Sequence, residues 1–88
     1  MTAEYTIHYS GKALLHMFRE ELDTAHVRRI IDEGKTIQEF IHLGIPHQVI
    51  VHAIDGRYIS VSCVRLESDV IVEAVCMTGR SVNCEVHL

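Results

Sequence analysis

The chain has 88 residues, 48% of them hydrophobic and 23% charged, and its formal net charge at pH 7 is −4. This composition indicates one globular domain, residues 1–88, and it excludes a disordered chain or a membrane span, since no apolar run approaches ~20 residues. The acidic balance disfavours binding to RNA or DNA, because nucleic-acid-binding domains usually carry a basic face.

The first segments predict a strand and then a helix. Glu4–Tyr9 alternates between apolar and polar residues, as a half-buried strand does. Ser10 is a suitable N-cap for a helix over Gly11–Glu21. The apolar residues with helical spacing are expected to form the buried face of this helix: Leu14, Leu15, Phe18 and Leu22.

A second helix follows almost at once. Asp23 or Thr24 is expected to cap it, and Gly34 is expected to end it. Its apolar stripe consists of Val27, Ile30 and Ile31. Because helices of about ten residues are marginal alone in water, both must pack on a sheet.

The next segment, Thr36–Leu43, permits either a strand or a helical turn. We favour an extended strand, because Gly44-Ile45-Pro46 after it is a turn signal. Pro46 cannot donate a hydrogen bond to a ladder, which fits a strand that is only beginning there.

Three consecutive strands are predicted next, rich in Val, Ile, Tyr and Cys. They cover His47–Ile54, Arg57–Leu66 and Asp69–Thr78, joined by the turns Asp55-Gly56 and Glu67-Ser68. Residues 79–88 hold a possible further edge strand. The predicted fold class is therefore α+β, with two short helices packed on one face of a mostly antiparallel sheet of four to six strands.

The first turn between these three strands, at Asp55-Gly56, allows two alternative strand registers. A three-residue turn over Ile54-Asp55-Gly56 would pair Ala53 with Arg57, whereas a two-residue Asp-Gly turn would place His52 in the core. We favour the first, because it separates polar from apolar residues better. It predicts a core face made of Val49, Val51, Ala53, Ile59, Val61, Cys63, Val72, Ala74 and Cys76.

The opposite face of the sheet carries apolar residues that would otherwise meet water. Such a surface is typical of protein association. We expect a homodimer or a small protein partner, with a non-enzymatic function as the leading hypothesis. The expected interface consists of Ile50, Val64, Ile71, Val75 and Met77.

The same face holds a candidate catalytic cluster. In the favoured register His52 and Tyr58 are cross-strand neighbours, and so are Ser62 and Glu73. A His or Tyr beside a cation can move the 2′-hydroxyl proton in a metal-free ribonuclease. His52, Tyr58 and Glu73 are the catalytic candidates, with Arg57 and Arg65 as RNA contacts; the alternative is a half-solvated face with scattered polar residues.

Seven histidines raise a third hypothesis, a metal-binding domain. His42, His47 and His52 are spaced by five residues, without the tight ligand spacing that metal sites usually show. His16 and His26 are expected on solvated helix faces. We therefore predict neither a metal nor another cofactor.

The order of elements resembles the RelE/ParE toxin superfamily, and most closely a small domain family of unknown function related to the BrnT-type toxins. The resemblance covers about residues 5–78 and rests on short motifs. These are His8, Arg19–Thr24, Val27–Gly34, Asp55–Ile59 and the closing strand Val70–Thr78.

This resemblance implies a RelE-like fold. It also implies, as an alternative function, a ribosome- or RNA-directed endoribonuclease toxin with an antitoxin-like partner. Of the His-Ala and paired arginines usual in the first helix of that family, the segment Lys12–Arg19 keeps only Arg19.

The three cysteines, Cys63, Cys76 and Cys84, contain no CxxC motif. A two-residue second turn places Cys63 and Cys76 about 13 Å apart, at ~3.3 Å per residue, which is too far for a disulfide. We expect both to be reduced core residues. Reduced cysteines and a start without a secretory signal predict a cytoplasmic protein.

Overall fold

The computed structural model describes residues 4–77 and has an α+β fold. Its elements in chain order are β1 (Thr6–Tyr9), α1 (Gly11–Arg19), α2 (Thr24–Glu33), β2 (Lys35–His42), β3 (Ile45–Ile54), β4 (Arg57–Arg65) and β5 (Asp69–Met77). The predicted α+β class, with its order of elements, is confirmed. The possible strand within residues 79–88 lies outside the described residues.

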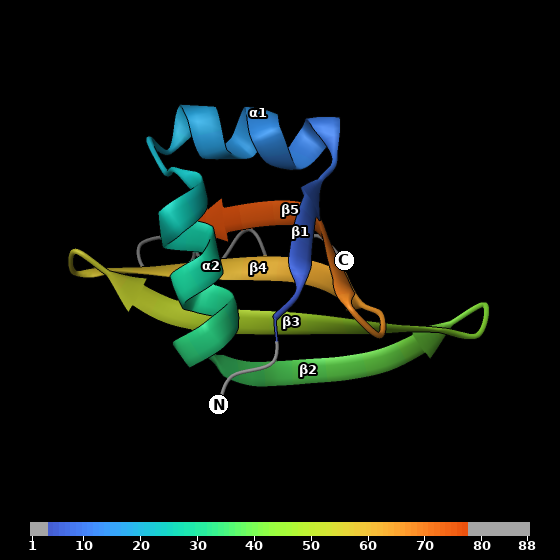
Figure 1. Cartoon of the computed structure of the whole chain (residues 1–88). Helices are drawn as coiled ribbons and strands as arrows, with labels where there is room; N and C mark the ends of the chain where they lie inside the picture. The colour runs from blue at the N-terminus through green and yellow to red at the C-terminus, as the bar shows by residue number, and fades with distance from the viewer. Residues whose placement is uncertain (1–3, 78–88) are drawn as a thin grey trace.

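The five strands form one sheet in the order β1-β5-β4-β3-β2. All neighbours are antiparallel except β1, which runs parallel to β5. Figure 1 shows α2 crossing one face of the sheet and α1 lying along its β5 side. Within the described part of the chain, no helix is long and apolar enough to cross a membrane.

The turn between β3 and β4 has two residues, so the register favoured from the sequence is wrong. Asp55 and Gly56 have φ values of 52° and 78°, and Ile54 pairs with Arg57. These are the positive angles of a type I′ turn, which both residue types tolerate and whose twist matches that of the strands. The two-residue turn over Asp55-Gly56 is therefore formed in place of the three-residue turn over Ile54-Asp55-Gly56.

The shorter turn moves every side chain of β3 to the other face. Ile50 and Ile54 lie in the core beneath the helices, whereas Val49, Val51 and Ala53 do not. On β4, by contrast, Ile59, Val61 and Cys63 are buried as predicted.

An irregularity in the β4–β5 ladder changes the face of β5 part-way along. The second turn has its predicted two residues, since the Leu66 N–H donates to the Asp69 carbonyl at 2.8 Å. Between Ser62 and Cys63 the pairing then shifts by one residue on β5. The core therefore receives Val70, Val72 and Val75, and the predicted core positions Ala74 and Cys76 fall outside it.

Helix α1 buries a different face from the predicted one. Ala13, Met17 and, beyond the helix, Leu22 are buried; Leu14, Leu15 and Phe18 are exposed. The cause is His16, expected in solvent, whose Nδ1 accepts the Val75 N–H at 3.2 Å. With His16 turned to the strand, its neighbours on that side of the helix face the sheet.

Helix α2 follows the prediction closely. Asp23 is its N-cap, and the Asp23 and His26 side chains each accept the other's backbone N–H in a reciprocal capping box. His26 is thus part of the cap rather than a purely solvated residue. The helix ends at Gly34 and buries Val27, Ile30 and Ile31.

Candidate protein-association surface

Strand β2 is an uncovered edge of the sheet. All eight of its residues are exposed, and within the described part of the chain only its β3 side is paired. An edge strand presents unpaired backbone N–H and C=O groups, and natural proteins usually shorten, charge or cover such edges. β2 is long, and its only residues charged at neutral pH are Lys35 and Glu39.

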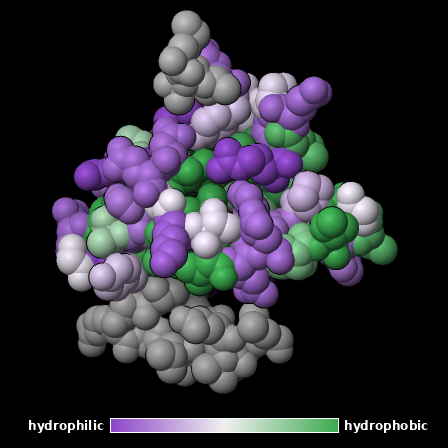
Figure 2. Space-filling model, turned by 90° about the horizontal axis from the view of Figure 1, so that it is seen from below, coloured by the Kyte–Doolittle hydropathy of each residue, from purple (hydrophilic) through white to green (hydrophobic). Residues whose placement is uncertain are grey.

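Large apolar side chains accompany this edge. Ile41 is 74% exposed and Leu43, in the turn, is 86% exposed. We call the hairpin patch the set of exposed apolar residues on β2, the turn and the start of β3, namely Ile37, Phe40, Ile41, Leu43 and Ile45. Figure 2 views the molecule from its β2 side and shows hydrophobic residues gathered at the right-hand end, where β2 turns into β3.

The turn itself is unusual in carrying a leucine. Leu43 and Gly44 have φ values of 54° and 78°, and His42 pairs with Ile45 around them. Positive φ suits Gly, Asn or Asp, and a branched apolar residue there is strained. The predicted turn Gly44-Ile45-Pro46 is therefore displaced, because β3 already begins at Ile45.

The hairpin tip projects beyond the rest of the sheet. The pairing of β3 with β4 ends at His47 and Val64, whereas its pairing with β2 continues to Ile45. Figure 1 shows this turn at the far right of the molecule. The tip is therefore open to a partner on several sides.

Aromatic and polar contacts hold the hairpin in place on the face away from the helices. The Phe40 and His47 rings stack at 5.0 Å between centroids, and His42 meets His47 edge-on at 6.1 Å. His47 Nδ1 lies 3.3 Å from a Glu73 carboxylate oxygen on β5. These contacts fix the position of Phe40 and so give the patch a defined shape.

On the helix side, Gln48 connects β2 to β4. Its amide nitrogen donates to Glu39 at 3.0 Å, and its amide oxygen accepts from Arg65 at 3.2 Å. A hollow of about 530 Å³ lies along this part of the hairpin, and Ile41 and Pro46 are among the residues that line it. The edge therefore has a polar framework with apolar side chains exposed around it.

The opposite edge of the sheet, formed by β1 and β5, is covered, whereas the β2 edge is not. Strand β1 has only four residues, so among the described residues it leaves the second half of β5 without a strand neighbour on the side away from β4. Ser10 and His16 bind that half of β5: the Ser10 hydroxyl donates to the Glu73 carbonyl at 3.0 Å, and His16 accepts from Val75. Among the described strands, β2 thus offers the long edge that no helix or side chain covers.

The candidate catalytic residues are not brought together. His52 pairs with Ile59 and lies on the helix side, 3.8 Å from Glu33, whereas Tyr58 pairs with Ala53 and points to the opposite face. Glu73 contacts His47 instead of Ser62. The cluster depended on the three-residue turn, and the actual turn separates it.

The two proposed RNA contacts lie at opposite ends of β4. Arg57 is 3.9 Å from Glu20, and Arg65 binds Gln48 and lies 5.9 Å from the Tyr5 ring centre. Eight residues of strand separate them by about 26 Å. They do not form a continuous basic surface.

The predicted interface residues are mostly covered. Ile50 is 1% and Val75 is 2% exposed, so their predicted exposure is wrong; the turn and the β5 irregularity place both in the core. Val64 is buried on the other face, Met77 packs against the core, and Ile71 is half-buried. Half of the large exposed apolar residues lie on β2, its turn and the start of β3 instead. The spacing of residues along the chain did not identify β2 as an edge strand.

The histidines do not form a metal site in the part of the chain that is described. His42 and His47 are close, but His52 lies on the other face of the sheet. No group of three potential metal ligands occurs among residues 4–77.

Cys63 and Cys76 differ in oxidation state. Cys63 is free and buried, and burial raises the pKa of its thiol. Cys76, expected to be reduced, is disulfide-bonded. The distance argument excluded only a bond between Cys63 and Cys76.

Searches against protein-family models, curated proteins and solved structures give no significant match to this chain. The resemblance to the RelE/ParE superfamily therefore stays a prediction that rests on the motifs quoted above. Function has to be inferred from the surface of the molecule itself.

Proposed function

We propose that the chain is a protein-association module that pairs, through the open edge of β2, with a second copy of itself. The observation that carries this proposal is the exposure of all eight β2 residues beside the apolar hairpin patch. Pairing of two edges satisfies outward backbone groups and buries apolar surface in one step. The product is one continuous ten-stranded sheet.

The sequence of β2 favours an antiparallel pairing centred on Phe40. Beyond the irregularity at Ile37, the residues alternate between the two faces, with Phe40 on the face away from the helices and Glu39 on the other. A two-fold axis at Phe40 places the two Phe40 rings side by side and opposes no like charges. An axis at Glu39 would oppose two carboxylates directly, which destabilises a strand pair.

The endoribonuclease alternative has less support from the geometry. His52 and Tyr58 point to opposite faces, and Arg57 and Arg65 lie at opposite ends of a strand. Association through β2 requires no catalytic group.

The location that we propose is the cytoplasm, as expected from the sequence. The free thiol of Cys63 is compatible with it. The disulfide at Cys76 favours a less reducing setting, because such bonds are rare in the cytosol. Counting free thiols in protein isolated from cells without reductant decides between them: three support the cytoplasm, and one opposes it.

Sedimentation equilibrium of two lysine variants tests the association. Phe40→Lys places a charge at the centre of the proposed pairing, and Leu15→Lys places the same charge on a similarly exposed apolar position of α1. We expect a dimer for the wild type and for Leu15→Lys, and a monomer for Phe40→Lys, because two lysines would then lie directly opposite each other across the two-fold axis. A monomeric wild type at high micromolar concentration, or a dimer that only Leu15→Lys disrupts, would contradict the proposal.

A further inference from the structure

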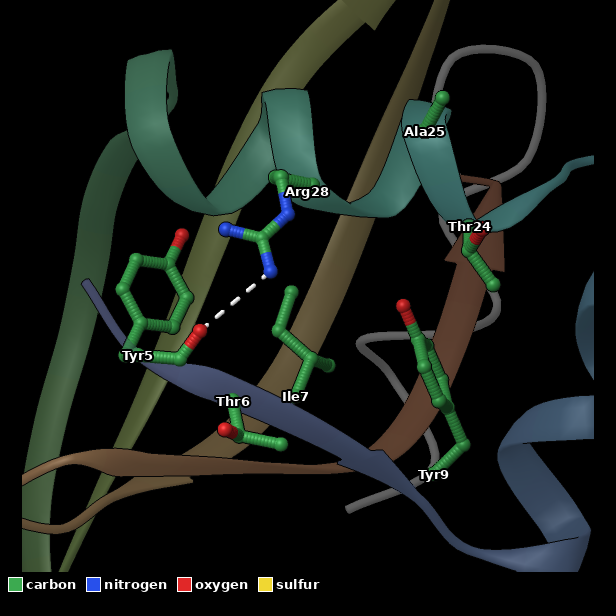
Figure 3. Close-up of a pocket in the computed structure, with 7 residues that line it drawn as sticks. All are labelled: Tyr5, Thr6, Ile7, Tyr9, Thr24, Ala25 and Arg28. Carbon is green, nitrogen blue, oxygen red and sulfur yellow. Dashed lines mark hydrogen bonds between the residues drawn. The ribbon is translucent and has the colours of Figure 1, made fainter.

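A second hollow, separate from β2, lies between β1 and α2. It has a volume of about 520 Å³, within the range of small-molecule sites. We call it the Arg28 pocket; its lining residues are Tyr5, Thr6, Ile7, Tyr9, Thr24, Ala25 and Arg28. Figure 3 shows the Arg28 guanidinium in the middle of this space, between the helix and the strand.

The Arg28 charge has no carboxylate partner among residues 4–77. Its guanidinium lies 4.8 Å from the centre of the Tyr5 ring and donates one long hydrogen bond, of 3.4 Å, to the Tyr5 carbonyl. Among the described residues, no carboxylate lies within ion-pair distance of it. A guanidinium has five N–H donors, so most of its donors remain for a ligand.

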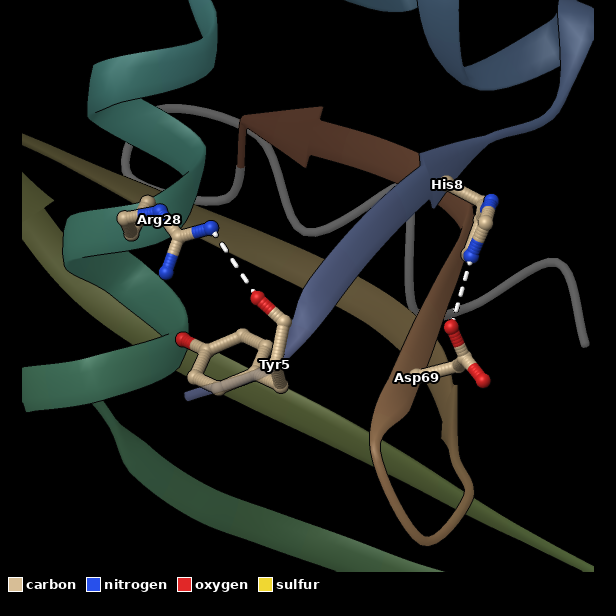
Figure 4. Close-up of polar contacts among 4 residues, drawn as sticks. All are labelled: Tyr5, His8, Arg28 and Asp69. Atoms are coloured by element: carbon tan, nitrogen blue, oxygen red, sulfur yellow. Dashed lines mark hydrogen bonds and ion pairs between the residues drawn. The ribbon is translucent and has the colours of Figure 1, made fainter. Parts of the chain in front are cut away.

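The nearby carboxylates are engaged elsewhere. Asp32, one helical turn from Arg28, accepts the Tyr5 hydroxyl, and Asp23 caps α2. Asp69 lies 2.9 Å from His8, and Figure 4 shows this pair on the other side of β1 from Arg28. The arrangement keeps the cation open toward the pocket.

The remaining walls supply hydroxyl and apolar groups. Tyr9 is half-buried, and Figure 3 shows its hydroxyl pointing toward the helix near Thr24. Within residues 4–77, neither the Tyr9 hydroxyl nor the Thr24 hydroxyl has a hydrogen-bond partner. A tyrosine hydroxyl is neutral at physiological pH, and burial raises the pKa of Tyr9 further, so this group is a neutral donor. Ile7 and Ala25 provide apolar surface between these groups and Arg28.

We propose that the Arg28 pocket binds a small organic anion, with a carboxylate or phosphate held by Arg28 and an apolar body of about ring size against Ile7 and Ala25. Carboxylate and phosphate share the planar or forked acceptor geometry that a guanidinium recognises. The hydroxyls of Tyr9 and Thr24 then supply further donors. A bare inorganic ion would use the cation but not the apolar wall.

A titration followed by amide NMR shifts tests this site. The probes are phenyl phosphate, benzoate and inorganic phosphate. We expect phenyl phosphate or benzoate to shift the amides of Thr6, Ile7 and Ala25 at millimolar concentration, and inorganic phosphate to bind more weakly. Which of the two organic probes binds more tightly identifies the preferred acid. Absence of shifts with both, or inorganic phosphate binding equally well, overturns the proposal.

Neighbouring arginines on α2 provide a matched control. Arg28→Gln should weaken binding by about tenfold or more, because it removes charge-assisted hydrogen bonds. Arg29→Gln makes the same charge change at a residue paired with Glu33, and it should leave the affinity within about twofold. Equal loss in both variants would show general electrostatic attraction instead of a site. Ala25→Leu, at an exposed helix position, should block the pocket without changing any charge.

Discussion

Gly34 shows how a single residue sets the distance between a helix and the sheet. A Cβ at this position would lie 2.7 Å from Ile50 Cγ2 and 2.8 Å from the Val51 carbonyl oxygen, and it would also meet the Ile30 carbonyl. These neighbours are backbone or core atoms that cannot move aside easily. The close approach of α2 to β3 therefore requires glycine here.

We predict that Gly34→Ala lowers the free energy of unfolding by about 1–3 kcal/mol, the usual cost of overpacking. Gly11→Ala is the control, because nothing lies within 4 Å of a Cβ built there. That variant should keep or slightly raise the stability, since alanine favours helix. Urea unfolding of both variants measures the difference, and equal midpoints would show that the close approach is not maintained in solution.

At the scale of elements, α1 acts as a cover for a strand edge. Ser10 and His16 bind backbone groups of β5 beyond the point where β1 ends. This role explains why the helix buries Ala13 and Met17 and leaves Phe18 82% exposed. Amphipathic spacing predicted that a helix exists, but its orientation depends on a hydrogen bond to a strand 59 residues away in sequence.

His16→Ala tests this role. It leaves the partly buried Val75 N–H without its acceptor, and we expect a loss of about 1–3 kcal/mol in unfolding free energy. Lys12→Ala, at an exposed position of the same helix, should stay within about 0.5 kcal/mol of the wild type. If thermal or urea unfolding gives the two variants the same stability, the hydrogen bond to β5 contributes nothing measurable.

Local sequence patterns predicted the elements better than their pairing. Alternation and capping residues are encoded within a few positions, so the strands, both helices and the Asp23 cap could be identified. The register of β3 depended on whether Asp55-Gly56 alone forms the turn. The face change along β5 depended on an irregularity opposite Ser62 and Cys63, for which the sequence carries no turn residue.

At the scale of the whole molecule, the candidate site could not be predicted because it depends on strand order. Phe40 and Ile41 were recognised as strand residues, but only the order β1-β5-β4-β3-β2 makes their strand an edge. The predicted interface failed at Ile50 because β3 turns its other face to the helices, and at Val75 because of the irregularity in the β4–β5 ladder. The expectation of protein association itself remains, now argued from β2 instead of Ile50 and Val75.

Amide hydrogen exchange of β2 at low and high protein concentration tests the central claim most directly. In a single copy, the β2 amides that point away from β3 face solvent, and pairing with a second copy would protect them. We predict that their exchange slows as concentration rises, while the amides of the short edge β1 exchange at unchanged rates. Exchange of the β2 amides that is independent of concentration, or protection that arises on β1 or α1 instead, would contradict association through this edge.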